Sequence, residues 1–146
     1  MGENIKTSVN GVKSVSGRLT ETDPAQYSPL ALAYLGDAVY ELIVRERVLK
    51  EGNRQVGKLH KKSTGYVNAG AQADLIMKIW DALTDEEKAV YKRGRNSNAH
   101  AAPKNQDVIA YRKATGFEAI IGYLYLAGRE ERAIELIKTG FNKINL

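Results

Sequence analysis

Apolar residues recur at intervals of three and four along most of the chain, so the sequence predicts helices and no strand of weight. The longest predicted helix begins after Ser28, which suits the N-cap, with Pro29 in its first position. It ends at Gly52, a residue typical of helix C-termini. The spacing predicts a buried stripe on this helix made of Leu32, Leu35, Val39, Leu42 and Ile43.

Five further helices follow in the same way. Thr84 and Glu87 have the spacing of a capping box, which places a helix start there, and this helix is expected to reach about Arg95. The others are predicted over about 56–66, 68–80, 107–128 and 129–145. The fold class is therefore all-α, with one folded domain over 26–146. Residues 1–25, rich in Ser, Thr, Gly and Asn, are expected to form a disordered or loosely attached tail.

Two of the apolar helices each contain a glycine and a carboxylate that a plain core helix would avoid. Gly36 costs about 1 kcal/mol relative to alanine in a helix interior, and an unpaired buried charge such as that of Asp37 is expensive. The second apolar helix repeats the pattern with Glu118 and Gly122. Each acid alone is equally explained by a bond to a helix end or by an arginine partner. Together, the glycines indicate that the two helices touch and that the two carboxylates converge.

Converging carboxylates predict either a shared proton or a cation. Two like charges about 4 Å apart repel by about 4 kcal/mol at an effective dielectric constant near 20. One carboxyl then keeps its proton, or a hard cation neutralises both. Oxygen ligands without His or Cys favour Mg²⁺ or Mn²⁺. In a basic protein, Mg²⁺ between carboxylates indicates phosphodiester chemistry.

Composition limits the other possibilities. The formal net charge of +5 and the pI near 9.4 favour a polyanionic partner. The absence of cysteine excludes disulfides and thiolate metal sites and fits a cytoplasmic protein. Two histidines, His60 and His100, are too few and too far apart to predict a zinc site. No apolar run approaches the length of a membrane span, and the N-terminus lacks the apolar region of a secretory signal.

Two blocks of the sequence, 52–73 and 88–106, carry several positive charges and no acidic residue. The lysines of the first block are equally typical of a solvated helix face. The second block surrounds a segment of loop composition, 96–103, which is expected to be mobile and to follow a nucleic-acid groove. The candidate RNA-binding residues are Lys61, Lys62, Arg93, Arg95, Asn96, Lys104 and Arg112.

The residues around the two acids carry a family resemblance. Residues 34–39, reading YLGDAV, resemble the signature helix of the ribonuclease III family, and residues 117–122, reading FEAIIG, resemble its second catalytic segment. The stretch 59–73 is similar to the family's middle helices, and the match extends over about 29–127. The segments KRGRN, PKN and YRKATGFEA are similar to those of the Mini-III subfamily, whose members are a ribonuclease III domain without an appended double-stranded-RNA-binding domain.

The resemblance implies the ribonuclease III helical fold and a homodimeric, Mg²⁺-dependent endonuclease, with Mn²⁺ able to substitute. Such an enzyme cuts double-stranded RNA to leave 5′-phosphate and 3′-hydroxyl ends, here in precursor large-subunit (23S) ribosomal RNA. Asp37 and Glu118 match the family's catalytic, metal-holding carboxylates. The dimer surface is expected on the signature helix, including Tyr34 and Tyr40.

The chain also departs from the family pattern. Larger relatives have a glutamate at the position of Ala33, another at that of Leu30, and an aspartate at that of Thr115. Two of four usual metal-shell carboxylates, those at the positions of Ala33 and Thr115, are thus absent, although the Thr115 hydroxyl is able to orient a metal-bound water. This favours the alternative of a catalytically silent RNA-binding or ribosome-associated module, whereas retention of both acids favours the nuclease. A helical DNA-binding protein is a weaker alternative, because no short helix-turn-helix pattern is found.

Overall fold

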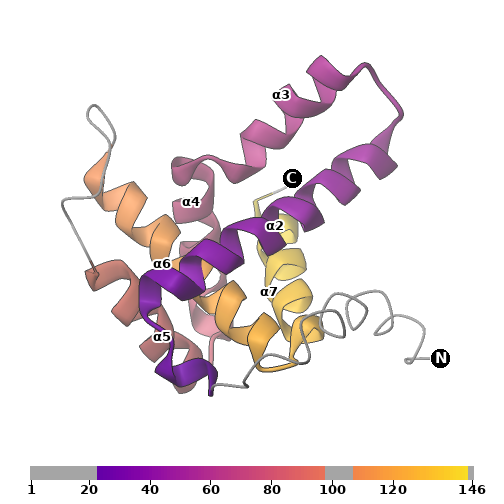
Figure 1. Ribbon diagram of the computed structural model, residues 1–146. Coiled ribbons are helices and arrows are strands. Elements are labelled where there is room, and N and C mark those ends of the chain that lie inside the picture. The colour runs from indigo at the N-terminus through magenta and orange to yellow at the C-terminus, as the bar shows by residue number, and fades with distance from the viewer. Residues whose placement is uncertain (1–22, 98–106, 145–146) are drawn as a thin grey trace.

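Figure 1 shows the computed structural model, which describes residues 23–97 and 107–144. In these ranges the chain forms six α-helices and two short 3-10 helices and no strand, which confirms the all-α prediction. The elements in chain order are η1 (Pro24–Gln26), α2 (Pro29–Glu51), α3 (Val56–Val67), α4 (Ala69–Ile79), η2 (Trp80–Ala82), α5 (Asp85–Asn96), α6 (Val108–Leu126) and α7 (Glu130–Lys143). Within the described ranges, no helix combines the length and hydropathy needed to cross a membrane. The predictions for residues 1–22, for 98–103 of the loop and for Lys104 fall outside the described residues.

The helix ends follow the local signals in the sequence. The Ser28 hydroxyl accepts a hydrogen bond of 3.1 Å from the Ala31 amide at the start of α2. Thr84 and Glu87 form both hydrogen bonds of the capping box at the start of α5. The side chains of Asn68 and Asp107 each accept a hydrogen bond from a backbone amide in the first turn of α4 and α6, respectively. The predicted helix over 68–80 ends slightly earlier than expected, because Trp80 belongs to η2.

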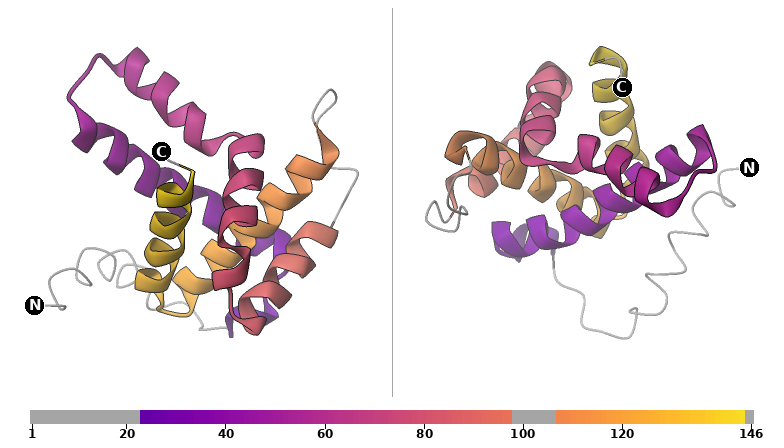
Figure 2. Two further views of the ribbon diagram at one scale, coloured as in Figure 1. Left: turned by 180° about the vertical axis from the view of Figure 1, so that it is seen from behind. Right: turned by 90° about the horizontal axis from the view of Figure 1, so that it is seen from above.

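Helix α6 lies at the centre of the fold, with α2, α4, α5 and α7 packed around it (Figures 1 and 2). Phe117, Ile121 and Leu124 of α6 are fully buried. The Tyr40 ring meets Phe117 edge to face at 5.1 Å between centroids, and its hydroxyl donates a 3.0 Å hydrogen bond to the Tyr66 carbonyl. The strongly apolar sequence of α6 suits this central position.

The closest contact between helices is the crossing of α2 and α6 at Gly36 and Gly122. A Cβ atom on Gly36 would lie 1.8 Å from the carbonyl oxygen of Glu118, and one on Gly122 would lie 2.0 Å from that of Leu32. Nothing larger than hydrogen therefore fits at either position, and the two backbones are in direct contact. The prediction that the two glycines bring these helices together is confirmed.

The buried face of α2 differs from the predicted stripe. The buried residues are Leu32, Ala33, Gly36, Tyr40, Val44 and Val48. Leu42 is 68% exposed, and Leu35, Val39 and Ile43 are half-buried. The reason is the crossing, because Gly36 must face α6 and the helix is therefore rotated away from the side richest in large apolar residues. Tyr40, expected on a dimer surface, is only 1% exposed, so that prediction is wrong.

A buried ion pair joins α5 to α7 on another side of the core. The Arg132 guanidinium donates through Nε and Nη2 to the two carboxylate oxygens of Glu87, each at 2.9 Å. Burial alone would raise the pKa of Glu87, but the hydrogen bonds from Arg132 and from the Thr84 amide outweigh it and leave the pKa below its usual range. Glu87 therefore caps its own helix and anchors the neighbouring one as an ionised carboxylate.

The crossing predicts the response to added side-chain volume. Gly36→Ala is expected to lower the free energy of unfolding by about 3 kcal/mol, because its methyl group overlaps the Glu118 carbonyl and the helices must separate. Gly65→Ala is the matched control in exposed helix α3, where no atom lies within 4 Å of the new Cβ. Gly65→Ala is expected to raise the free energy of unfolding by about 0.5 to 1 kcal/mol. Urea unfolding measures both, and equal effects would contradict the close crossing.

Candidate active site

Asp37 and Glu118 come together because they flank the helix crossing. Asp37 directly follows Gly36 on α2, and the Glu118 carbonyl is the group that Gly36 contacts on α6. Asp37 is exposed, whereas Glu118 is half-buried. The expectation that Asp37 is held in an apolar interior is therefore wrong, since the rotation of α2 that buries Gly36 turns the next residue to the surface. The convergence of the two carboxylates is nevertheless present.

The Glu118 carboxyl keeps its proton more tightly than an ordinary glutamate. Burial, the negative charge of Asp37 and a hydrogen bond between the two carboxyl groups, in that order, together raise its pKa to about 8. In that hydrogen bond the protonated Glu118 donates to Asp37. Without a cation, the pair therefore shares one proton at neutral pH.

A third side chain, Gln72 of α4, reaches the same site and was missed from the sequence. It is 1% exposed, and its amide lowers the pKa of Glu118. Its Nε2 atom is buried and completes no hydrogen bond with any described residue. A signal was available, because Gln72 falls on the apolar face formed by Leu75, Ile76 and Ile79, where a polar side chain requires an explanation.

The positions where larger relatives have further carboxylates contribute none here. Ala33 is buried and Leu30 is exposed on α2. Thr115 is buried one turn before Glu118, and its hydroxyl donates a 3.0 Å hydrogen bond to the Tyr111 carbonyl. Its oxygen still has accepting capacity, and its role toward a metal-bound water stays a prediction. Among the described residues, no group of three or more His, Cys, Asp or Glu side chains is placed to hold a metal ion.

Two of the predicted RNA-binding cations have partners within the chain. Lys62 forms a 2.8 Å ion pair with Glu51 between α3 and α2. The Arg93 guanidinium lies 3.4 Å from the Tyr27 carbonyl oxygen and 3.5 Å from that of Ala25, so it contacts the segment that precedes α2. Both side chains therefore stabilise the fold as well as contributing positive charge.

The remaining described candidates lie on three helices. Arg95 stacks on the Tyr91 ring at 5.6 Å from its centroid and donates to the Asn96 side chain. Lys61 is exposed on α3, and Arg112 is half-buried on α6 with an Nε that has no partner among the described residues. Figures 1 and 2 show α3 and α5 at opposite ends of the molecule. The structure thus groups Arg93, Arg95 and Asn96 but places Lys61 and Lys62 apart from them.

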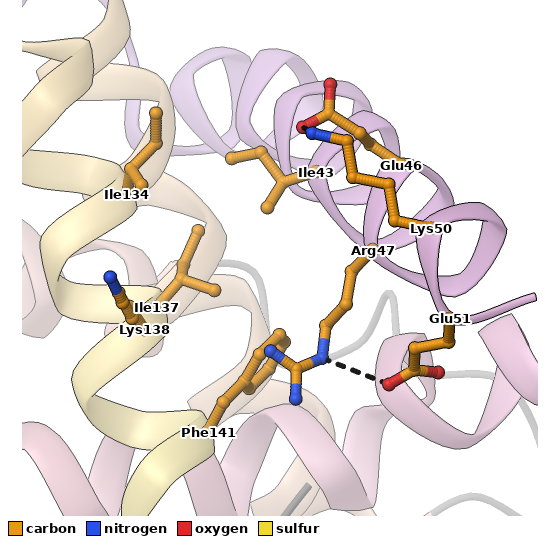
Figure 3. A pocket seen from close by; sticks show the side chains of 9 residues that line it. All are labelled: Ile43, Glu46, Arg47, Lys50, Glu51, Ile134, Ile137, Lys138 and Phe141. Atoms are coloured by element: carbon orange, nitrogen blue, oxygen red, sulfur yellow. Dashed lines mark hydrogen bonds and ion pairs between the residues drawn. The ribbon is translucent and has the colours of Figure 1, made fainter.

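A separate cleft of about 580 Å³ lies between α2 and α7 (Figure 3). Arg47 reaches into it, with its guanidinium 4.9 Å from the Phe141 ring centroid and its Nε 3.6 Å from a Glu51 carboxylate oxygen. Neither Asp37 nor Glu118 lines this cleft, so it is distinct from the carboxylate pair.

Comparison with known proteins places these features in a family. The family model described as the ribonuclease III domain matches residues 30–129, which include both carboxylates and both glycines of the crossing. The chain belongs to the ribonuclease III family. The predicted resemblance to this family and to its Mini-III subfamily is confirmed by the relatives that follow.

Curated relatives named Mini-ribonuclease 3 match over most of their length. The one from Symbiobacterium thermophilum is 49% identical over 116 residues, which cover 80% of this chain and 89% of the relative. The one from a Thermoanaerobacter species is 43% identical over 134 residues, covering 92% and 94%. A crystal structure of a Fusobacterium nucleatum protein is also similar, with a TM-score of 0.75, 36% identity, and coverage of 86% of this chain and 99% of that one.

The raised pKa of Glu118 predicts how the stability of the metal-free protein depends on pH. The folded state binds this proton more tightly than the unfolded state does, where an ordinary glutamate titrates near 4.5. The stabilisation is therefore complete below about pH 4.5 and is lost as the pH rises toward 8. In EDTA, the melting temperature of the wild type is expected to fall more between pH 5 and 8 than that of Glu118→Gln. Glu46→Gln, at an exposed position of α2, is the control; parallel curves for all three proteins would contradict the assignment.

Proposed function

We propose that this endoribonuclease of the ribonuclease III family depends on a divalent metal ion and cleaves double-stranded RNA. Its substrate in this proposal is precursor large-subunit (23S) ribosomal RNA in the cytoplasm. The observation that carries the proposal is the pairing of Asp37 and Glu118 at the glycine crossing, inside the segment that matches the family model. The net charge of +5 supports a polyanionic substrate.

The chemistry of the donor set fits Mg²⁺, with Mn²⁺ as a substitute. Asp37 and Glu118 offer oxygen atoms, which suit hard cations, and their mutual repulsion is relieved when a cation replaces the shared proton. When bound there, Mg²⁺ supplies an activated water and neutralises charge on the phosphate and leaving oxygen. The chain holds the two carboxylates in place through the contact of the two backbones, and Glu118 must release its proton before it can act as a ligand.

A catalytically silent RNA-binding module remains the alternative, and the replacement of two carboxylates by Ala33 and Thr115 favours it. The carboxylate pair favours the nuclease. A half-buried acid with a pKa raised to about 8 opposes folding once it ionises, and a silent module gains nothing from it. An exposed Asp37 beside it serves no packing purpose.

RNA binding in this proposal uses positive charges on more than one helix. The major groove of A-form RNA is too deep and narrow for side chains to read, so contacts go to phosphates and 2′-hydroxyls across the minor groove. Among the described candidates, Lys62 pairs with Glu51 and Arg93 donates to main-chain carbonyls, so both would share these partners with the RNA. Lys61, Arg95 and Arg112 form no ion pair with the described residues. Their separation on the protomer suits a long duplex better than a compact ligand.

The exposed side of α2 supports a homodimer. Five apolar residues share this side at helical spacing: Leu30, Tyr34, Ala38, Leu42 and Leu49. Tyr34 is 83% exposed and Leu42 is 68% exposed, values that are costly for large apolar side chains facing water. A duplex has two strands of opposite polarity, and a two-fold axis presents one site to each strand. Asp37 is exposed on the same helix, directly before Ala38 of this surface.

Removal of either carboxylate charge tests the catalytic proposal. Asp37→Asn and Glu118→Gln keep the side-chain shape but weaken cation binding, so Mg²⁺-dependent cleavage of duplex RNA is expected to fall by at least about 100-fold. Duplex binding, measured without divalent metal, is expected to persist because no basic residue is changed. The matched control is Glu46→Gln, an exposed acid of α2 that is expected to cleave normally. Near wild-type cleavage by Asp37→Asn would remove the pair from the mechanism.

Charge placed on the exposed side of α2 tests the dimer. The wild type is expected to scatter light as a particle of about twice the chain mass of 16.1 kDa. Tyr34→Asp and Leu42→Asp are each expected to give monomers. The two-fold symmetry would bury two copies of the introduced carboxylate in one interface. Met77→Asp alters an exposed apolar residue of α4 and is expected to leave the dimer intact. A monomeric wild type at micromolar concentration would contradict the proposal.

A further inference from the structure

The buried amide of Gln72 is an exception within an otherwise apolar stripe. Helix α4 packs against α6 through Leu75, Ile76 and Ile79, all nearly inaccessible to water, and Gln72 occupies the next position of the same face. Buried polar atoms in proteins almost always have a hydrogen-bond partner. The Nε2 of Gln72 has none among the described residues.

Packing does not account for this residue. A leucine or methionine has a similar volume and would fill the space without leaving a polar group unsatisfied. The group that the Gln72 amide influences is the Glu118 carboxyl, whose pKa it lowers. An amide nitrogen is a donor and is neutral, so it is able to stabilise a carboxylate without adding charge to the site.

The position of Gln72 in the fold directs this donor toward the carboxylate pair. Helix α4 packs against α6, which carries Glu118, and the side-chain amide of Gln72 is buried at that contact. A carboxylate that binds a cation through one oxygen keeps accepting capacity on the other, and the buried N–H of Gln72 is placed to occupy it.

We propose that Gln72 is a positioning residue of the metal site, whose side-chain amide donates to Glu118 and holds that carboxylate in its cation-binding orientation. This inference rests on the proposed function. It assigns one group to each of three helices: Asp37 on α2, Glu118 on α6 and Gln72 on α4. In metal sites, outer partners that orient ligands are worth about 10- to 100-fold in affinity. Their effect matters more in a site with fewer carboxylates.

The test separates metal binding from folding. Free Mn²⁺ is followed by electron paramagnetic resonance during titration of the RNA-free protein, and the melting temperature is measured in EDTA. Gln72→Leu is expected to weaken Mn²⁺ binding about 10- to 100-fold. It is also expected to raise the metal-free melting temperature by a few degrees, because a buried unsatisfied donor is removed. Gln72→Met, which has nearly the same shape, is expected to do the same and guards against a packing defect of leucine.

The control variant is Met77→Leu, an exposed change in the same helix that is expected to alter neither Mn²⁺ binding nor the melting temperature. Mn²⁺ binding by Gln72→Leu and Gln72→Met equal to that of the wild type would overturn the role of Gln72 alone. A lower metal-free melting temperature in both variants would also overturn it, since the amide would then serve the fold. A wild-type protein that binds no Mn²⁺ would instead overturn the proposed function, and this inference with it.

Discussion

Two helix backbones that touch without a side chain between them determine the geometry of this molecule. At Gly36 and Gly122, the carbonyl groups of Glu118 and Leu32 occupy the space where Cβ atoms would otherwise be. This contact fixes the rotation of α2, and through it decides which residues enter the core and which face water. It also sets the separation of the main-chain positions from which the side chains of Asp37 and Glu118 extend toward each other.

The carboxylate pair illustrates a conflict between folding and chemistry. Burial and the charge of Asp37 keep a proton on Glu118, and the Gln72 donor beside it has no partner. Each of these features lowers the stability of the metal-free protein, and in the proposed function a bound cation relieves both. The rest of the core compensates with ordinary means, including the apolar packing of α6 and the fully hydrogen-bonded pair of Glu87 and Arg132.

The sequence predicts those features that depend on nearby residues. The helix bounds follow from Ser28, Thr84 and Gly52, whose signals act within one turn, and all six helices lie close to the predicted ranges. The contact at the two glycines was also predictable, because each is costly in a helix unless a backbone approaches it. The roles of Asp37 and Glu118 came from the family resemblance added to that contact, and they stay predictions.

Features that depend on the rotation of a helix within the fold were not predictable in the same way. Periodicity predicted that Leu42 is buried, and the implied dimer predicted that Tyr40 is at a surface. The close packing of Gly36 on α6 reverses both. The partners of Lys62 and Arg93 lie on other elements, so the charge pattern of the sequence could not show that these side chains have partners within the chain.

The glycine crossing also has a consequence during synthesis. More than half of the chain separates Gly36 from Gly122. At about 5 to 20 residues per second, the ribosome makes the first carboxylate several seconds before the second one exists. A nascent chain therefore cannot assemble the carboxylate pair during that interval.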